Sequence, residues 1–193
     1  MRLFILDGLL RPDFDPQLTL QGGSLLLRPL AADDQEPLFA VAKDPAVWAG
    51  HPAKDRYKRE VFEPYFNTLL ASGGTLAVCR TKDGHVIGCS RYYEAPDHPE
   101  SISIGYTFLG RAFWGGQTNH AMKSLMLTHA YDCVDTVWFH IDPTNIRSQK
   151  ATERLGAVLV SEGPLTLSGN RGVWQSWRLD QDAWERTKSV RAT

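Results

Sequence analysis

The chain has 193 residues, of which 42% are hydrophobic and 22% are charged, and its formal net charge is −1. This length and composition are typical of one soluble globular domain that is large enough to bury a core. The near-neutral charge excludes the basic surplus of proteins that bind nucleic acid or anionic membranes.

The three cysteines, Cys79, Cys89 and Cys133, have no paired spacing. This pattern favours a reducing compartment and argues against a disulfide framework. The apolar run at residues 3–6 ends at Asp7 and is too short for a signal sequence or a transmembrane helix. We therefore expect a cytoplasmic protein.

The first 23 residues show no hydrophobic period and contain Pro12 and Pro16. We expect an N-terminal arm over residues 1–23, with at most one edge strand, and a single domain over residues 24–193. Pro64 lies inside a helical pattern and predicts a kink or a break there. The elements predicted first are a strand at 24–30, a helix at 31–43, a loop at 48–52 and a helix at 55–71.

After residue 74 the hydrophobic period changes from that of a helix to that of a strand. The predicted elements are strands at 75–80, 85–94 and 101–109, a helix at 117–132, a strand at 136–141, a helix at 145–155, strands at 157–161 and 173–179, and a helix at 180–188. Loops are expected at 95–100 and 163–172. A right-handed crossover through the helix at 117–132 makes the strands on either side of it parallel. The order predicts an α+β fold of the three-layer type with a mixed central sheet.

Gly115 and Gly116 form a backbone pivot directly before the helix at 117–132. No Asp or Glu occurs between Arg111 and Asp132. The start of a helix presents unpaired N–H groups and the positive end of the helix dipole, and glycines let an anion approach closely. The stretch therefore suggests a phosphate-binding site. By itself it leaves open an ordinary turn before an amphipathic helix that packs on the core.

The order of elements and three local patterns resemble the GNAT superfamily of acyl-CoA-dependent N-acyltransferases. The closest branch is that of the ribosomal-protein N-terminal acetyltransferases, which are RimJ/RimL-like. The patterns are IGYTFLGRAFWGG at residues 104–116, HIDPTNIRSQKATERLGA at 140–157 and LLLRPLAADD at 25–34. The resemblance covers roughly residues 24–180. It implies direct transfer of an acetyl group from acetyl-CoA to a primary amine: a protein N-terminus, an amino acid or a small amine. It also implies a parallel strand pair around the cofactor helix, and this branch often forms homodimers.

Carried over by position, the resemblance implies the residues that bind CoA. Backbone amides at the helix start would hold the pyrophosphate: Gly115, Gly116, Gln117, Thr118 and Asn119. Pantetheine would lie along the preceding strand at Phe108, Leu109 and Gly110, as an added strand does. Asn145 and Ser148 would hold a pantetheine amide and reach the sulfur. The family usually has glycine at the position of Gln117 and a small residue at that of Asn119, so these two either add hydrogen bonds or partly fill the site.

Acyl transfer to an amine needs a base, a donor to the carbonyl oxygen and a proton or hydrogen bond for the thiolate. Ser148 is the candidate acid, because Thr152 stands where many GNAT enzymes have a tyrosine. Glu94 and His140 are the candidate bases, since Ser103 stands where the family often has a glutamate. The alternatives are a solvated carboxylate for Glu94 and a hydrogen-bonded structural histidine for His140.

The acceptor side is expected to involve aromatic and cationic residues. Trp48 and Trp114 are candidates for cleft walls, and His51 and Arg56 for reading a carboxylate or carbonyl of the acceptor. The alternative for Arg56 is a surface ion pair with Glu60 at a spacing of four. Three tyrosines either line the acceptor pocket or belong to the core: Tyr92, Tyr93 and Tyr106.

Other classes of site have less support in the sequence. His120 and His129 share no helix face with an acidic partner, so no metal site is expected. Nucleophilic hydrolysis and P-loop chemistry lack their motifs. The second hypothesis is an acyl-CoA-binding sensor or scaffold with little catalytic activity, motivated by the absent tyrosine and glutamate. CoA release against a panel of amines separates the two hypotheses.

Overall fold

The computed structural model describes residues 13–115 and 117–191; residues 1–12 of the expected arm, Gly116 and residues 192–193 lie outside the described residues. The strands are β1 Leu20–Gly22, β2 Leu25–Pro29, β3 Thr75–Arg80, β4 Val86–Ala95, β5 His98–Leu109, β6 Thr136–Ile141, β7 Val158–Leu167 and β8 Asn170–Asp180. The helices are η1 Ala32–Asp34, α1 Gln35–Ala42, α2 Pro45–Trp48, η2 Lys54–Tyr57, α3 Arg59–Ala71, η3 Arg111–Phe113, α4 Thr118–Tyr131, α5 Ile146–Glu153 and α6 Gln181–Arg191, where η marks a 3₁₀ helix. None of the described helices has the length and apolar character needed to cross a membrane.

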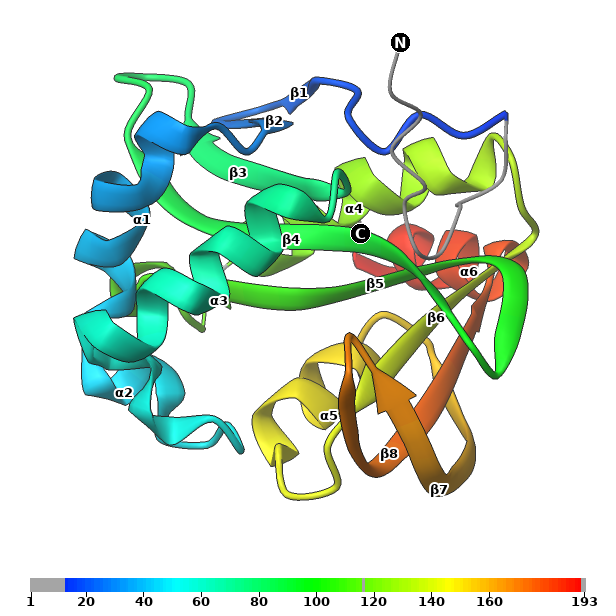
Figure 1. Ribbon diagram of the computed structural model, residues 1–193. Helices are drawn as coiled ribbons and strands as arrows, with labels where there is room; N and C mark the ends of the chain where they lie inside the picture. Colours follow the sequence, from blue (N-terminus) through cyan, green and yellow to red (C-terminus); the bar gives the residue numbers. More distant parts are fainter. Residues whose placement is uncertain (1–12, 116, 192–193) are drawn as a thin grey trace, which may run out of the picture.

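The strands form one eight-stranded sheet in the order β1-β2-β3-β4-β5-β6-β8-β7 (Figure 1). The central pair β5 and β6 is parallel, and the other neighbouring pairs are antiparallel. The chain passes from β5 through α4 to β6, which is the crossover that the sequence predicts. The predicted α+β fold, with a mixed sheet and a parallel pair on either side of the α4 segment, is confirmed.

Helices cover both faces of the sheet and make the fold a three-layer structure (Figure 1). On one face α1, α2 and α3 bury side chains such as Leu38 and Phe62 against the sheet, and both of these are 0% exposed. On the other face α4 and α6 bury Met122 and Trp184. Strands that are covered on both faces read as continuous apolar runs. This explains why the first five residues of β3 are all buried.

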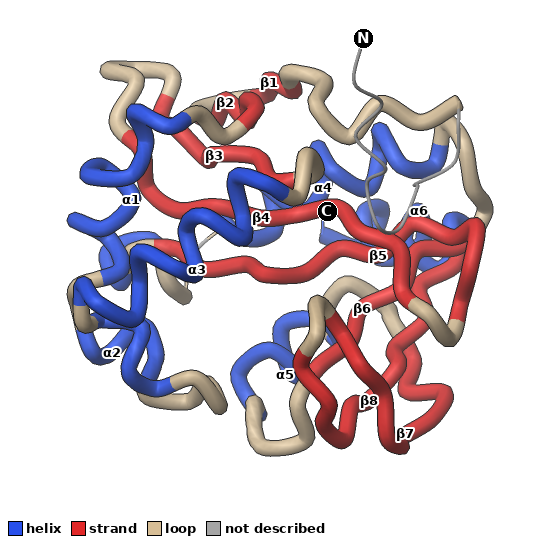
Figure 2. The backbone as a smooth tube through the Cα atoms, in the orientation of Figure 1, coloured by secondary structure: helices blue, strands red, loops and turns tan. Residues whose placement is uncertain are grey.

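The parallel pair is short, and this feature decides where the site lies. β5 and β6 are in register only at Ile102 with Val137 and at Ser103 with Trp138. Beyond these pairs the two strands diverge (Figure 2), while β6 continues to pair with β8. A bulge in β5, at which Tyr106 has a positive φ of 52°, accompanies the divergence. One backbone edge of β5 is therefore open from residue 104 onward.

The described part of the N-terminal arm packs along α4. Phe14 is 5% exposed and stacks on His129 with ring centroids 4.7 Å apart. The His129 Nε2 atom lies 2.8 Å from the carbonyl oxygen of Asp15. β1 then forms the expected edge strand by pairing with β2. The arm covers the outer end of α4 and leaves the start of this helix open.

The structure has a short helix, α2, that the sequence analysis did not predict, directly before the predicted loop at 48–52. Asp44 and Pro45 end α1 as expected, but they also begin the short helix α2. The Asp44 carboxylate accepts a hydrogen bond from the Ala46 N–H at 3.0 Å, and Pro45 stands in the first turn, where no N–H is needed. An Asp-Pro pair is thus both a stop signal and a start signal.

The helix predicted at 55–71 is also different. It is divided into η2 and α3, because Lys58 between them has an extended backbone conformation. Asp55 lies inside η2 and forms an ion pair with Lys58 at 2.8 Å, so it does not cap α3. The break comes before Pro64, and α3 continues through Pro64 to Ala71.

The loops predicted at 95–100 and 163–172 are wrong, because both segments form hairpins. β4 and β5 pair as far as Ala95 with His98, and β7 and β8 pair as far as Leu167 with Asn170. The second turn consists of Ser168 and Gly169, which have φ values of 46° and 76°. A two-residue hairpin turn needs positive φ only at its two central positions. The prediction from the glycine-rich composition therefore made this loop too long.

Candidate functional site

A cavity of about 370 Å³ opens where β5 and β6 diverge. It is lined by α2 and the loop to η2, by α3, β5 and the start of α4, and by β6 and α5. The predicted residues that line it are Trp48, His51, Arg56, Tyr93, Tyr106, Phe108, Leu109, Trp114, Gly115, Asn119, His140, Asn145 and Ser148. The predicted residues outside its lining are Tyr92, Glu94, Gly110, Gln117 and Thr118. The fold thus brings together residues that are up to 100 positions apart in the chain.

The end of β5 forms one wall of the cavity. Phe108 and Leu109 line it, and the Trp114 indole N–H donates to the Leu109 carbonyl oxygen at 2.8 Å. The N–H of Gly110 donates to the Ile87 carbonyl oxygen at 2.8 Å, and is therefore used inside the sheet. The indole holds the turn before α4 against the strand.

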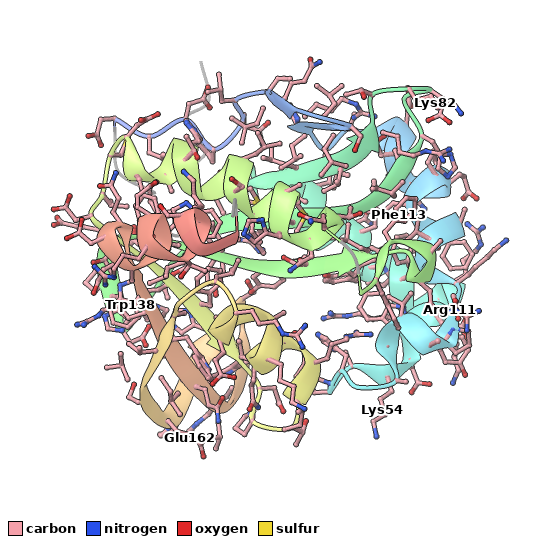
Figure 3. All side chains as sticks on the ribbon, turned by 180° about the vertical axis from the view of Figure 1, so that it is seen from behind. Lys54, Lys82, Arg111, Phe113, Trp138 and Glu162 are labelled. Atoms are coloured by element: carbon pink, nitrogen blue, oxygen red, sulfur yellow. The ribbon has the colours of Figure 1, made fainter. Side chains whose placement is uncertain are left out.

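The start of α4 faces the cavity with Gly115 and Asn119. Gly115 has a φ of 71°, a conformation that favours glycine, and a Cβ atom added there would meet nothing within 4 Å. Gln117 is the N-cap of α4, makes no side-chain capping bond, and no acidic residue occurs in the first turn. The turn before α4 lies on the same side of the molecule as η2, as the labelled Phe113 and Lys54 show (Figure 3). Because the first turn of α4 has no acidic residue and no capping side chain, its N–H groups are available to an anionic ligand.

The start of α5 forms the opposite wall. Asn145 is its N-cap and accepts a hydrogen bond from the Ser148 N–H at 3.2 Å. This bond orients the first turn, so that Ser148 lines the cavity one turn before Thr152. The Arg147 guanidinium donates to the Val47 carbonyl oxygen at 2.7 Å and lies 4.2 Å from the Trp114 ring centroid. Arg147 thereby connects α5 with α2 and with the turn before α4.

The loop between α2 and η2 presents a neutral histidine, and η2 presents an arginine. The Ala53 N–H donates to His51 Nδ1 at 2.9 Å, so the ring proton is on Nε2. Burial lowers the pKa of His51 to about 4, and the ring is neutral at pH 7. The Arg56 guanidinium lies 3.7 Å from the Tyr65 ring centroid. Arg56 is thus held by an aromatic ring, and the alternative of a surface ion pair with Glu60 is not seen in the described part of the chain.

His140 is hydrogen-bonded on both ring nitrogens. Its Nδ1 atom lies 2.9 Å from the Tyr93 hydroxyl oxygen, and its Nε2 atom lies 3.1 Å from Asp97 Oδ1. His140 therefore lines the cavity, as expected of a candidate base, and is also hydrogen-bonded within the fold, as the structural alternative expected. Sequence reasoning missed Asp97, because it lies in the β4–β5 turn, 43 residues from His140.

The other tyrosines and Glu94 have different environments. Tyr92 belongs to the core and donates to the Met126 carbonyl oxygen at 2.8 Å. The Tyr106 hydroxyl pairs with Ser168 Oγ at 2.6 Å. Glu94 is half-buried on β4, outside the cavity lining.

Lys123 is a cavity residue that the sequence analysis did not single out. It lies on the sheet-facing side of α4 and is 6% exposed. Its Nζ atom donates to Thr107 Oγ1 at 2.8 Å and to Ser90 Oγ at 3.1 Å, both uncharged partners. Burial lowers the pKa of Lys123 to about 7. The sequence feature that could have identified Lys123 is its position directly after Met122, a residue of the apolar face of the predicted helix.

The cavity has a surplus of positive charge. Its cationic side chains are Arg56, Lys123, Arg147 and Arg154, and Asp142 is the only carboxylate in its described lining. Such a surface attracts anionic ligands. The described residues hold no group of three His, Cys, Asp or Glu residues arranged to bind a metal ion. The arrangement suits an extended anionic ligand that passes between an open strand edge and an uncapped helix start.

Comparison with protein families gives one match. A family model described as an acetyltransferase (GNAT) domain matches residues 24–158. None of the curated proteins matches the sequence.

Solved structures share the fold. One is a GCN5-related N-acetyltransferase from Brucella melitensis, with a TM-score of 0.75 and 18% identity over 90% of this chain and 83% of that chain. Another is Mycobacterium smegmatis RimJ in complex with CoA-disulfide, with a TM-score of 0.65 and 16% identity over 90% and 95%. A third is an acetyltransferase from Agrobacterium tumefaciens str. C58, with a TM-score of 0.63 and 22% identity over 85% and 95%. At these identities the similarity shows the fold alone.

The burial of Lys123 predicts a pH-dependent stability. The folded-state pKa is lowered from 10.5 to about 7, so the folded protein binds fewer protons than the unfolded chain between these values. The cost of burying the charge is complete below pH 7 and falls by at most about 1.4 kcal/mol per pH unit as the pH rises toward 10.5. Lys123→Met should be more stable than the wild type at pH 7, and its advantage should shrink by pH 9.5. Urea unfolding of both proteins at each pH measures this difference.

Lys150→Met is the matched control, because Lys150 is an exposed lysine on helix α5. Its difference from the wild type should not change with pH. A constant difference for Lys123→Met over the same range would contradict the lowered pKa.

Proposed function

The chain belongs to the GNAT family of acetyltransferases, and from this premise we propose that it is an acetyl-CoA-dependent N-acetyltransferase that acts on a primary amine by direct transfer. The observation that carries the proposal is the cation-rich cavity between the diverging strands β5 and β6. It has an open strand edge on one side and an uncapped helix start at one end. Acetyl-CoA supplies the acetyl group as an activated thioester.

The residues in the cavity fit CoA in three ways. The helix start at Gly115, with Asn119 beside it, offers N–H groups to a pyrophosphate. The edge of β5 at Phe108 and Leu109 offers backbone groups to the pantetheine amides. Asn145 and Ser148 line the wall opposite. Gln117 and Thr118 contribute to this proposal through the backbone alone, because they lie outside the cavity lining. Gly110 supports the turn, since its N–H and its carbonyl oxygen are both bonded within the protein, to Ile87 and Phe113.

Ser148 is the proposed proton donor to the thiolate leaving group. Ser148 lines the cavity, and the hydrogen bond from its N–H to the Asn145 side chain fixes its place at the start of α5. The backbone N–H groups of β5 beyond the bulge are the proposed donors to the carbonyl oxygen, because the divergence from β6 leaves this edge open. Of the two candidate bases, His140 reaches the cavity and Glu94 does not.

The proposed acceptor is an amine that carries a carboxylate or carbonyl near the amino group, as an amino acid or a peptide N-terminus does. His51 offers an Nε2–H donor and Arg56 a guanidinium, and both line the cavity. In an enzyme of the RimJ/RimL-like branch, we propose that these two residues bind the carboxylate or carbonyl group of the acceptor. With this function we propose a cytoplasmic location, which agrees with the free cysteines Cys79, Cys89 and Cys133. A homodimer remains an expectation from the branch.

A panel of amines tests the function and its alternative. We expect release of CoA from acetyl-CoA with amino acids or short peptides, and a higher kcat/KM for acceptors with a free or backbone carbonyl group than for simple alkylamines. CoA release is followed with a thiol reagent, and the acetylated product is identified by mass. Tight acetyl-CoA binding without turnover on any acceptor would favour the sensor or scaffold hypothesis.

The phosphate-binding start of α4 is tested at Gly115. Gly115→Val places a branched side chain in the open space before the helix, and we expect the Kd for CoA to rise at least 10-fold. Gly84→Val is the matched control: Gly84 also has positive φ, 69°, with nothing near its Cβ position, and it lies in the β3–β4 turn. Both variants should lose about 1 kcal/mol of stability through backbone strain. Equal CoA affinity in the two variants would refute the assignment.

Ser148 is tested as the acid by Ser148→Ala. We expect kcat to fall about 10- to 100-fold, because proton transfer by a positioned group contributes about 10²-fold or more. The Kd for acetyl-CoA should stay within about twofold. Ser148→Cys should recover part of the rate if a proton donor at this position is what matters. Wild-type turnover by Ser148→Ala would remove this residue as the acid.

A further inference from the structure

Three side chains from separate elements connect the cavity with the protein surface. They are Tyr93 on β4, His140 on β6 and Asp97 in the β4–β5 turn. Tyr93 and His140 are buried, at 6% and 8% exposed, whereas the Asp97 side chain is 26% exposed and reaches the surface. Ser176 Oγ donates to Asp97 Oδ2 at 2.7 Å and fixes the carboxylate. We refer to Tyr93, His140 and Asp97 as the proton chain.

The hydrogen bonds of the proton chain run in one direction, from Tyr93 to His140 and from His140 to Asp97. An ionised carboxylate only accepts, so His140 Nε2 carries a proton that it donates to Asp97 at 3.1 Å. In a neutral imidazole the other nitrogen is then an acceptor. The Tyr93 hydroxyl, at 2.9 Å from Nδ1, therefore donates its proton to His140. Its oxygen lone pairs are left for a group in the cavity.

Gly105 allows Tyr93 to occupy this position. A Cβ atom added at Gly105 would lie 2.9 Å from Tyr93 Cε1 and 3.3 Å from its hydroxyl oxygen. The Tyr93 ring thus lies over the backbone of β5, the strand between β4 and β6. Tyr106 packs edge-on against it, with ring centroids 5.3 Å apart. The hydroxyl can reach a residue two strands away because Gly105 has no side chain.

We propose that Tyr93 is a catalytic residue of the acetyl transfer, which takes a proton from the acceptor amine while it passes its own proton to His140. This inference rests on the proposed function. His140 is the proton acceptor that acts through Tyr93. Asp97 is a positioning residue, because it holds the tautomer of His140 and stabilises the imidazolium that forms.

The step balances in atoms and protons. The amine forms the new C–N bond, the C–S bond of the thioester breaks, and the thiolate takes a proton from Ser148, which recovers a proton from solvent. The amine loses one proton to the Tyr93 oxygen, and the original Tyr93 proton moves to His140 Nδ1. His140 becomes a cation beside the Asp97 carboxylate and then releases one proton to solvent on the Asp97 side, which returns it to the neutral form. Neither an oxidant nor a reductant is required.

The ionisable groups around His140 set its pH response. They are Asp97 in the turn, His98 on β5 and Tyr93 on β4, with Tyr106 and Arg91 behind Tyr93. Burial lowers the pKa of His140 below its usual 6.5, with Asp97 opposing this effect and His98 adding to it. His140 is therefore neutral at pH 7 and able to accept a proton. Below its pKa the imidazolium cannot accept, so the rate should fall on the acid side.

The test compares variants of the full chain with a saturating amine acceptor identified from the panel. Tyr93→Phe should lower kcat about 100-fold, leave the Kd for acetyl-CoA within twofold, and remove the acid limb of the kcat–pH profile. Asp97→Asn should lower kcat about 10-fold and move the midpoint of the acid limb to lower pH, because the imidazolium loses its carboxylate. Gly105→Ala should lower kcat by displacing the Tyr93 ring while every polar group is kept.

Tyr92→Phe is the matched control. It removes a buried tyrosine hydroxyl that donates to the Met126 carbonyl oxygen on the opposite face of β4. Its stability should fall, and its kcat and pH profile should match the wild type. Wild-type kcat in Tyr93→Phe, or an unchanged midpoint in Asp97→Asn, would overturn the proposal. A wild-type protein that acetylates no amine would instead overturn the proposed function, so the two failures are distinguishable.

Discussion

The arrangement of the site depends on the early end of the parallel pairing between β5 and β6. Two residue pairs in register hold the strands together, and after them each strand is bonded only on its outer side, to β4 or to β8. Backbone groups at an open edge need partners, and an extended ligand with amide groups provides them. The same divergence leaves room for α5 on one side and for the start of α4 on the other. The bulge with positive φ at Tyr106 is the local strain that accompanies this opening.

The cationic side chains in the cavity have different partners from those on the surface. Surface arginines such as Arg28, Arg59 and Arg80 pair with carboxylates. In the cavity, Arg56 and Arg147 lie over aromatic rings, and Lys123 is held by two hydroxyl groups. The aromatic rings hold Arg56 and Arg147 without neutralising their charge, so the cavity keeps a positive potential that suits an anionic ligand. A buried, unneutralised charge costs stability, which is a common feature of functional sites.

Much of the fold could be predicted from the sequence, and the errors have identifiable physical causes. Long elements with a clear period, such as β6 and α4, were placed within one residue of their observed ends. The hairpin turns at Pro96–Asp97 and Ser168–Gly169 were predicted as longer loops, because proline and glycine indicate turns without giving their length. Several cavity residues were named in advance through the family resemblance. Lys123 and Asp97 were not, since their importance comes from neighbours distant in sequence.

The sequence by itself determined the α+β class and the crossover around the helix after Gly115. These features depend on hydrophobic period, on turn residues and on the handedness of chain connections, all of which are local properties. Only the tertiary structure decided that His140 contacts both Tyr93 and Asp97, that Arg56 lies on Tyr65, and that Glu94 stays outside the cavity. The contact of His140 with Tyr93 depends on which strands become neighbours and on the space that Gly105 leaves for the Tyr93 ring. A hydrogen bond between residues 47 positions apart is set by packing, and no local pattern records it.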